Sequence, residues 1–175
     1  MKLLFIDVET TGLEPDTNEI IDIALIQTDM DGNVEKKWGS KIRPQYGCSA
    51  EAAKVNGYSP EAWASSPSYG EVVTYLTNAG FNEERYILVG WNVDFDKSFA
   101  LRMLKAAGIN ADYKTLDVFG MCWSVYFDFM FDFIKTNDKA PKLSNVLEYA
   151  RITNRAPHTA MGDCEAVHEL YWRIY

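Results

Sequence analysis

The N-terminal segment of the chain is an apolar run of strand length that leads into two acids, Asp7 and Glu9. Residues Lys2–Val8 (KLLFIDV) predict a buried strand. Glu19–Thr28 predicts a second strand, because apolar and polar residues partly alternate there. Met30–Asn33 predicts a turn and Trp38–Ile42 a third strand. The chain is therefore expected to begin with an antiparallel meander.

Strands and helices alternate in the rest of the chain. Ser59 followed by Pro60 predicts a helix start, and Ser68 and Glu71 have the spacing of a capping box that opens a helix to about Ala79. The other expected elements are strands at Tyr86–Trp91 and Lys114–Val118 and helices at Phe95–Ala107, Leu143–Ala150 and Asp163–Tyr175. This order predicts an α/β fold, in which helices cover the faces of a mixed sheet.

Length and composition fit one globular domain, residues 1–175, with 47% hydrophobic residues. The net charge of −8 argues against a broad basic surface for nucleic acid, although metal ions could supply positive charge locally. There is no apolar run of about 18 residues, no signal peptide and no C-x-x-C pair among the three cysteines. We expect a cytoplasmic protein with reduced thiols and no membrane partner.

The two acids that end the first strand are expected to point the same way. Residues two apart on a strand share a face, so Asp7 and Glu9 converge at its carboxyl end. Two like charges this close are costly unless a cation lies between them, and Mg²⁺ prefers carboxylate oxygens. Taken alone the pattern is weak, because such pairs are common on protein surfaces.

A second acidic segment, Gly90–Phe99 (GWNVDFDKSF), lies where a buried strand turns into a helix. It places Asp94 and Asp96 on the first helical turn or just before it. Acids are favoured there by the helix dipole, and Asp94 would make a good N-cap. This segment alone therefore favours an ordinary helix start.

A third segment, PHTAMGDCEAVHELY, combines a histidine and an acid at the entry to the last helix. His158 and Asp163 are five residues apart, so a uniform helix would point them in different directions. Pro157 and Gly162 favour a lead-in loop for His158, from which its side chain could reach the cleft that Asp163 faces. This segment alone therefore favours a surface histidine and an ordinary acid at a helix N-terminus.

Together the three segments resemble a known family. D-x-E-T-T-G, N-x-x-F-D and H-x-x-x-x-D, in this order, are similar to the motifs of DnaQ-like 3′→5′ exonucleases with Asp-Glu-Asp-Asp-His active sites. KVNGYSPE and LSNVLEYARI resemble further parts of that family. The resemblance implies a ribonuclease H-like fold with a mixed five-stranded sheet flanked by helices.

The resemblance also implies roles for individual residues. The metal ligands would be Asp7, Glu9, Asp96 and Asp163, with His158 as general base. The substrate-binding residues would be Thr10, Thr11, Gly12 and Leu13, which would contact the terminal nucleotide, and Asn92, which would lie near the substrate. The cofactors would be two divalent ions, Mg²⁺ or in its place Mn²⁺, about 3.5–4 Å apart. Arg151 and Arg155 could steer phosphate or be solvated surface arginines.

The segment Met121–Lys135 is unusually aromatic and departs from the family pattern. It fits a strand with four phenylalanines on one face or a helix with one polar stripe; its length favours a helix. Such a helix is expected to be deeply buried, or else covered by a protein partner or a second copy of the chain.

The expected function is removal of mononucleotides from the 3′ end of single-stranded DNA or RNA. The alternatives are a proofreading subunit docked on a DNA polymerase, a non-catalytic nucleic-acid-binding module and a nucleotide-hydrolysing phosphatase. The last motif helix runs to Tyr175 without a further extension, which favours a free-standing enzyme. The presence of all five motif residues argues against a non-catalytic module.

Overall fold

The computed structural model describes residues 1–82 and 85–175, and the side chains of all of these except residues 112 and 113. The strands are β1 (Lys2–Thr10), β2 (Ile20–Thr28), β3 (Val34–Lys41), β4 (Arg85–Gly90) and β5 (Asn110–Asp117). The helices in these ranges are α1 (Ala50–Asn56), α2 (Pro60–Trp63), α3 (Tyr69–Asn78), α4 (Val93–Ala106), α5 (Val118–Val125), α6 (Phe127–Asn137), α7 (Leu143–Tyr149) and α8 (Ala160–Ile174).

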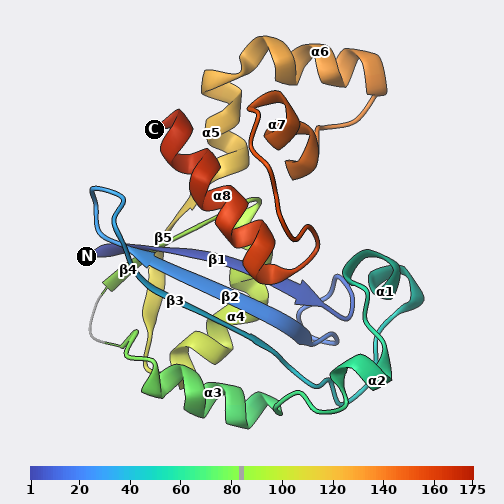
Figure 1. Ribbon diagram of the computed structural model, residues 1–175, viewed down its shortest axis with the longest axis vertical. Coiled ribbons are helices and arrows are strands. Elements are labelled where there is room, and N and C mark those ends of the chain that lie inside the picture. The colour runs from blue at the N-terminus through green and yellow to red at the C-terminus, as the bar shows by residue number, and fades with distance from the viewer. Residues whose placement is uncertain (83–84) are drawn as a thin grey trace.

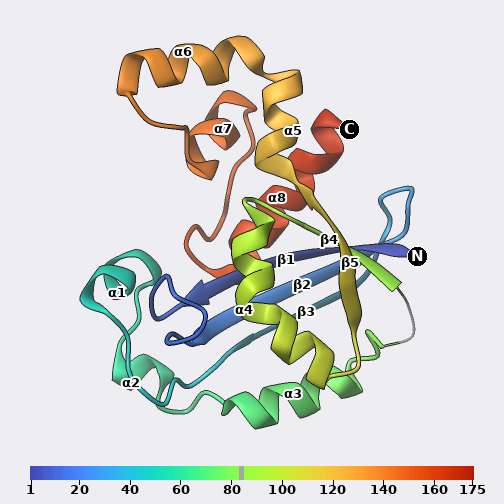
Figure 2. The same cartoon turned by 180° about the vertical axis from the view of Figure 1, so that it is seen from behind.

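Helices cover both faces of a five-stranded sheet with the order β3-β2-β1-β4-β5 (Figures 1 and 2). β2 is antiparallel to β1 and β3, whereas β4 and β5 continue the sheet in parallel. This is the α/β fold expected from the sequence, including the initial meander. In the described part of the chain, no helix combines the length and apolar character needed to cross a bilayer.

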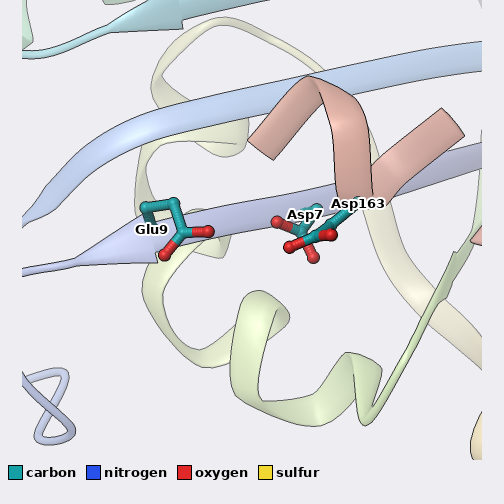
Figure 3. Close-up of side chains that lie close together, drawn as sticks. All are labelled: Asp7, Glu9 and Asp163. Carbon is teal, nitrogen blue, oxygen red and sulfur yellow. The ribbon is translucent and has the colours of Figure 1, made fainter. Parts of the chain in front are cut away.

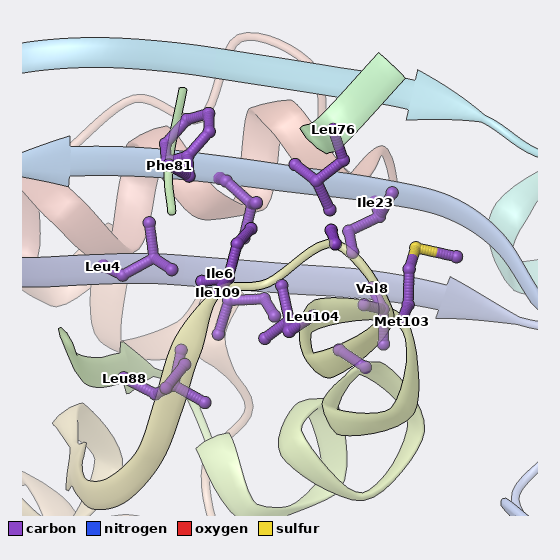
Figure 4. Close-up of a cluster of buried hydrophobic side chains, with 14 of the residues drawn as sticks. Leu4, Ile6, Val8, Ile23, Leu76, Phe81, Leu88, Met103, Leu104 and Ile109 are labelled. Atoms are coloured by element: carbon purple, nitrogen blue, oxygen red, sulfur yellow. The ribbon is translucent and has the colours of Figure 1, made fainter. Parts of the chain in front are cut away.

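Alternation along β1 divides the core into two clusters. Leu4, Ile6 and Val8 face α3 and α4, where they pack with residues such as Leu76 and Met103 (Figure 4). Leu3 and Phe5 face the other way, into a cluster built from α5, α7 and α8. Asp7 and Glu9 belong to this second set of positions and therefore point to the α8 side of the sheet.

The sheet opens where β1 and β4 part. Their parallel pairing runs from Lys2 opposite Tyr86 to Phe5 opposite Val89, and the chain then leaves β4 for α4. The carboxyl half of β1 is paired on its other side with β2, up to Thr10 opposite Ile20. Such a split at the carboxyl ends of strands is a common place for a ligand site in α/β proteins.

The capping box of α3 is confirmed, since Ser68 Oγ accepts from Glu71 N and the Glu71 carboxylate accepts from Ser68 N. The expected N-cap role of Asp94 is wrong. Asn92 occupies the cap of α4, with a left-handed backbone (φ 52°) that asparagine tolerates better than most residues, and Asp94 lies inside the first turn.

The aromatic segment is helical, but two expectations for it are wrong. The chain bends at Tyr126 (φ −115°, ψ 35°), so α5 and α6 are separate helices. α6 is also not deeply buried: Met130 is its one buried residue, and Phe127 and Phe131 are 55% and 43% exposed. Figure 1 shows the reason, because α6 lies beyond α5 and α7, away from the sheet.

Candidate active site

Three carboxylates meet at the opening of the sheet. Asp7 and Glu9 come from β1 and Asp163 from the first turn of α8, and one oxygen of each lies within 4.8 Å of the other two (Figure 3). All three side chains are partly buried. An all-oxygen set of this kind suits a hard divalent cation such as Mg²⁺ or Mn²⁺.

Burial raises the pKa values of all three acids, and repulsion from neighbouring carboxylates adds to the shifts of Asp7 and Glu9. Burial is the main cause for Asp7, whose pKa lies well above its ordinary value, with Asp96 and Asp163 as the leading repulsive charges. Burial raises the pKa of Glu9 to about 7, and the charges of Asp163 and Asp22 contribute. The cluster therefore lacks positive charge, and a bound cation would relieve it.

Asp22 is an acid of this region that the sequence analysis missed. It lies directly opposite Glu9 in the antiparallel pair β1–β2, and its carboxylate accepts a hydrogen bond from Ala160 N at 3.3 Å. It thus ties the start of α8 to the sheet. Its signal in the sequence, one acid within an apolar strand, gives no indication of the cross-strand partner.

Asp96 lies beside the cluster, not within the group of three. Its side chain is only 3% exposed, and its Oδ1 accepts a hydrogen bond from Val8 N at 2.9 Å. Burial raises its pKa to about 8; the Val8 N–H opposes this shift, and the charges of Glu9 and Asp117 add to it. Asp96 is also the strongest repulsive neighbour of Asp7, so the four acids form one electrostatic unit.

His158 lies on the loop before α8, as expected, with an exposed side chain and a left-handed backbone (φ 62°). Its backbone N–H donates to Asp163 Oδ2 at 3.2 Å, while the Asn154 amide donates to the other oxygen of Asp163. Asn154 was also missed, because a single asparagine in a loop carries no periodic signal. The two contacts fix the carboxylate relative to the histidine.

Gly162 allows this loop to approach α8. A Cβ at that position would lie 2.0 Å from the carbonyl oxygen of Ala156. Thr159 caps the helix, its Oγ1 accepting from Gly162 N at 3.1 Å. Gly162, which favours a lead-in loop in the sequence, thus lies inside α8 and has a definite packing role against that loop.

Two cavities flank the carboxylates. One, of about 300 Å³, is lined by Glu9, Thr10, Gly12, Leu13, Val55 and Phe95, among others. The other, of about 550 Å³, is lined by Asp7, Asp163, His158 and Asn92 together with Trp91, Phe119 and Lys142, among others. Most of the expected site residues are therefore divided between two sides of one opening, whereas Thr11 and Asp96 line neither of these two cavities.

The segment Thr10–Leu13 is held by side-chain hydrogen bonds of its two threonines. Thr10 Oγ1 donates to Gly12 O at 2.6 Å, and Thr11 Oγ1 accepts from Glu19 N at 2.9 Å. Thr11 is only 3% exposed, so its side chain holds the loop and does not line the cavity. Leu13, in contrast, is 78% exposed at the rim.

Asn92 and the two arginines occupy different places. The Asn92 N–H donates to Asp117 Oδ1 at 2.8 Å, which joins the start of α4 to the end of β5. Arg151 and Arg155 are exposed and line another pocket, which shares Asn154 with the larger cavity. That placement favours the solvated-surface interpretation of the arginines.

Residues 4–171 match the sequence model of the RNase T family, which is described as exonuclease. The chain belongs to this family. Its members are 3′→5′ exonucleases, hydrolases of the DnaQ-like group, which use divalent metals. The resemblance drawn from the three motifs is confirmed.

The chain is 25% identical over 170 residues to the DNA polymerase III PolC-type of Thermotoga petrophila, covering 97% of this chain but 11% of that protein. It is 24% identical over 168 residues to the DNA polymerase III subunit epsilon of Treponema pallidum, covering 94% of this chain and 72% of that protein. The chain thus spans about a tenth of the length of its PolC-type relatives.

The fold is shared with E. coli Exonuclease I. The crystal structure of that enzyme in complex with a dT13 oligonucleotide superposes with a TM-score of 0.78 at 18% identity, covering 99% of this chain and 40% of that one. A second complex, with a dA16 oligonucleotide, gives a TM-score of 0.76 at 19% identity. The mixed sheet and its covering helices are therefore the ribonuclease H-like arrangement.

Proposed function

We propose that this chain, acting as one domain of residues 1–175, removes nucleoside monophosphates one at a time from the 3′ end of single-stranded DNA or RNA. The observation that carries the proposal is the meeting of Asp7, Glu9 and Asp163 within 4.8 Å, where the sheet opens between two cavities. Family membership supports the direction of digestion.

The residues present fit a divalent metal centre. Asp7, Glu9 and Asp163 would hold it, with Asp96 as the fourth acid. Burial raises the pKa values of all four carboxylates, and neighbouring acids add to the shifts of Asp7, Glu9 and Asp96. Two Mg²⁺ ions, or Mn²⁺ in their place, would activate water and stabilise the departing 3′ oxygen. Because the protein has a net charge of −8, the metal centre would also supply the local attraction for phosphate.

His158 is the proposed general base. Its loop position leaves the imidazole exposed at the same cavity as Asp7 and Asp163, and its backbone is tethered to Asp163. A neutral imidazole there can take a proton from the attacking water. Asn154 keeps Asp163 oriented while this happens.

The smaller cavity suits the terminal nucleotide. Leu13, Val55 and Phe95 give it an apolar wall for a base, and Thr10 and Gly12 also line it. Leu13 at the rim can wedge against the terminal base, because its exposed side chain is free to contact the substrate. Asn92 borders the larger cavity, on the side from which the rest of the strand would enter.

A proofreading role is the second candidate. The similarity to the Treponema pallidum DNA polymerase III subunit epsilon and to PolC-type polymerases favours it. A free-standing enzyme should digest single strands well by itself, whereas a proofreading subunit should act faster when its polymerase is present.

The test is a time course with 5′-labelled DNA and RNA oligomers, single-stranded and duplex, in Mg²⁺ or Mn²⁺. Stepwise shortening of single strands supports the proposal, and the ratio of the DNA and RNA rates assigns the substrate. Activity confined to mononucleotides such as nucleoside triphosphates would instead support the phosphatase alternative, and binding without hydrolysis would support a non-catalytic module.

A further inference from the structure

Five aromatic rings form a continuous row that starts in the larger cavity and ends on the outer surface of α6. They are Trp91, Phe119, Trp123, Phe127 and Phe131, and we call them the aromatic track. Consecutive ring centroids are 5.1, 6.5, 6.3 and 5.6 Å apart. The first two rings line the cavity that holds Asp7, His158 and Asp163.

The sequence builds this row by spacing. Phe119, Trp123, Phe127 and Phe131 recur every four residues, which keeps them on one side of consecutive helical turns. The row continues across the bend at Tyr126, since Trp123 and Phe127 remain in ring contact. Lys135 is the next position in the series, and its Nζ lies 4.4 Å from the centre of the Phe131 ring.

Core packing explains the inner rings but not the outer ones. Trp91, Phe119 and Trp123 pack against the buried cluster under α8. Phe127 and Phe131 lie outside both clusters and are 55% and 43% exposed, with their rings nearly parallel (13°). Two adjacent exposed phenylalanines have a free energy cost in water that a bound ligand would offset.

The charges beside the track also differ from those of the whole protein. The stretch from residue 127 to residue 142 has three lysines and three aspartates, so it is neutral in a chain of net charge −8. Lys142 lines the larger cavity and Lys135 covers the outer ring, so two cations lie at the two ends of the track. Asp128 and Asp132 follow the outer rings by one residue each, about 100° further round the helix.

We propose that the aromatic track is a stacking path for the unpaired bases that precede the scissile nucleotide. The proposal rests on the proposed function. A nucleic acid whose 3′ end occupies the smaller cavity must cross the carboxylates, and the track begins on their other side. Aromatic rings next to cations are the usual means of holding single strands without sequence preference, because every base has a face to stack. A surface for protein docking would not need continuity with the catalytic cavity.

The test compares two substrates and matched variants. The variant F127L/F131L keeps most of the apolar area and removes the aromatic ring faces, whereas F127W/F131W keeps aromatic ring faces. The control variant Y75L removes a similarly exposed tyrosine (50%) from α3, on the opposite side of the sheet. Dissociation constants are measured in Ca²⁺, which binds carboxylate oxygens with looser geometry, for dT12 and for dT12 with abasic sites at the second to fifth positions from the 3′ end.

We expect F127L/F131L to bind dT12 at least about 5-fold more weakly than the unaltered protein, which is the loss of one stacked base. The abasic strand should bind the variant and the unaltered protein equally, and F127W/F131W and Y75L should retain full affinity for dT12. In Mg²⁺, F127L/F131L should raise KM for dT12 while kcat for a dinucleotide stays within about twofold.

Equal dT12 affinity for the leucine variant and the unaltered protein would overturn the proposal. So would a change confined to sedimentation behaviour, which would identify the track as a surface for self-association or protein docking. If the unaltered protein hydrolysed neither substrate, the proposed function itself would fail, and the binding arm in Ca²⁺ would still test the track. Thermal unfolding of each variant excludes loss of the fold as the cause.

Discussion

The Asp96 carboxylate occupies the place in the β1 ladder that β4 leaves open. Its Oδ1 accepts from Val8 N at 2.9 Å, three residues beyond the last β1–β4 pair at Phe5 and Val89. One catalytic candidate thus also satisfies a buried backbone donor. Substitutions at Asp96 can remove the negative charge alone, or the charge together with the hydrogen bond from Val8 N.

Asp96→Asn should retain the fold and lose most activity, because the amide oxygen can still accept from Val8 while the charge is gone. Asp96→Ala should in addition lower the free energy of unfolding by about 1–3 kcal/mol, since it leaves the Val8 N–H buried and unpaired. Urea unfolding and exonuclease rates measure the two effects. Asp94→Asn, on the same helical turn but exposed, is the control and should change neither. Larger activity loss in Asp94→Asn would show that the wrong acid was chosen.

The metal-free protein should become less stable as the pH rises. The pKa of Glu9 is raised to about 7 by burial and by the charges of Asp163 and Asp22, so its proton is held more tightly in the folded state than in the unfolded state. Protonated Glu9 therefore contributes up to about 3 kcal/mol to the free energy of unfolding. This contribution is complete below about pH 4 and is lost as the pH rises through about 7. The raised pKa of Asp96, about 8, acts in the same direction.

Thermal unfolding in EDTA from pH 5 to pH 8.5 measures this loss. Glu9→Gln should make the unfolding midpoint depend less on pH. At pH 8, added Mg²⁺ should raise the midpoint of the unaltered protein more than that of the variant. A midpoint in EDTA that rises over this range, with no response to Mg²⁺, would argue against a metal centre at these carboxylates.

Replacement of His158 should affect turnover and not binding. Asparagine suits the left-handed backbone (φ 62°) better than alanine does, so His158→Asn removes the imidazole with little added strain. We expect turnover to fall by about 10²–10⁴-fold. The affinity for an oligonucleotide in Ca²⁺ should stay within about twofold, because the four carboxylates remain. If the whole effect were weaker binding, His158 would be a contact residue and not the base.

Gly162→Ala should disrupt the loop that carries Asn154 and His158. The added Cβ would lie 2.0 Å from Ala156 O, so the loop or the helix must move, at a cost of about 1–3 kcal/mol. Gly70→Ala in α3 is the matched control, because its Cβ would meet nothing within 4 Å and alanine favours a helix. The free energy of unfolding, measured in denaturant, and the exonuclease rate should both fall in Gly162→Ala. Both should be maintained in Gly70→Ala.

The sequence predicts those features that depend on local pattern. Alternation on β1 places Asp7 and Glu9 on one face, and Pro157 with Gly162 places His158 on a loop, both as found. Features that depend on distant contacts or on an irregular loop were missed. Asp22 acquires its role from Glu9 across the strand pair and from Ala160, far away in the chain. Asn154 acquires its role from Asp163, which is close in the chain but is reached only through the irregular loop before α8.

The exposure of α6 could not be predicted for the same reason. A segment as apolar as Met121–Lys135 is typical of a buried helix, and only the arrangement of α5 and α7 shows that its outer side has no cover in the described chain. The cap of α4 was assigned to Asp94 instead of Asn92 because the left-handed start of the helix has no separate sequence signal.

The most direct test of the account follows one oligomer carrying a label at either end. With Mg²⁺, the 3′ label should appear as a mononucleotide at the earliest time, while the 5′-labelled strand shortens one nucleotide at a time. EDTA or the substitution Asp7→Asn should stop both reactions. The Asp7→Asn variant should still show a cooperative unfolding transition. Internal fragments at the earliest time, release of the 5′ label first, or full activity in EDTA would contradict a metal-dependent 3′→5′ exonuclease built on these carboxylates.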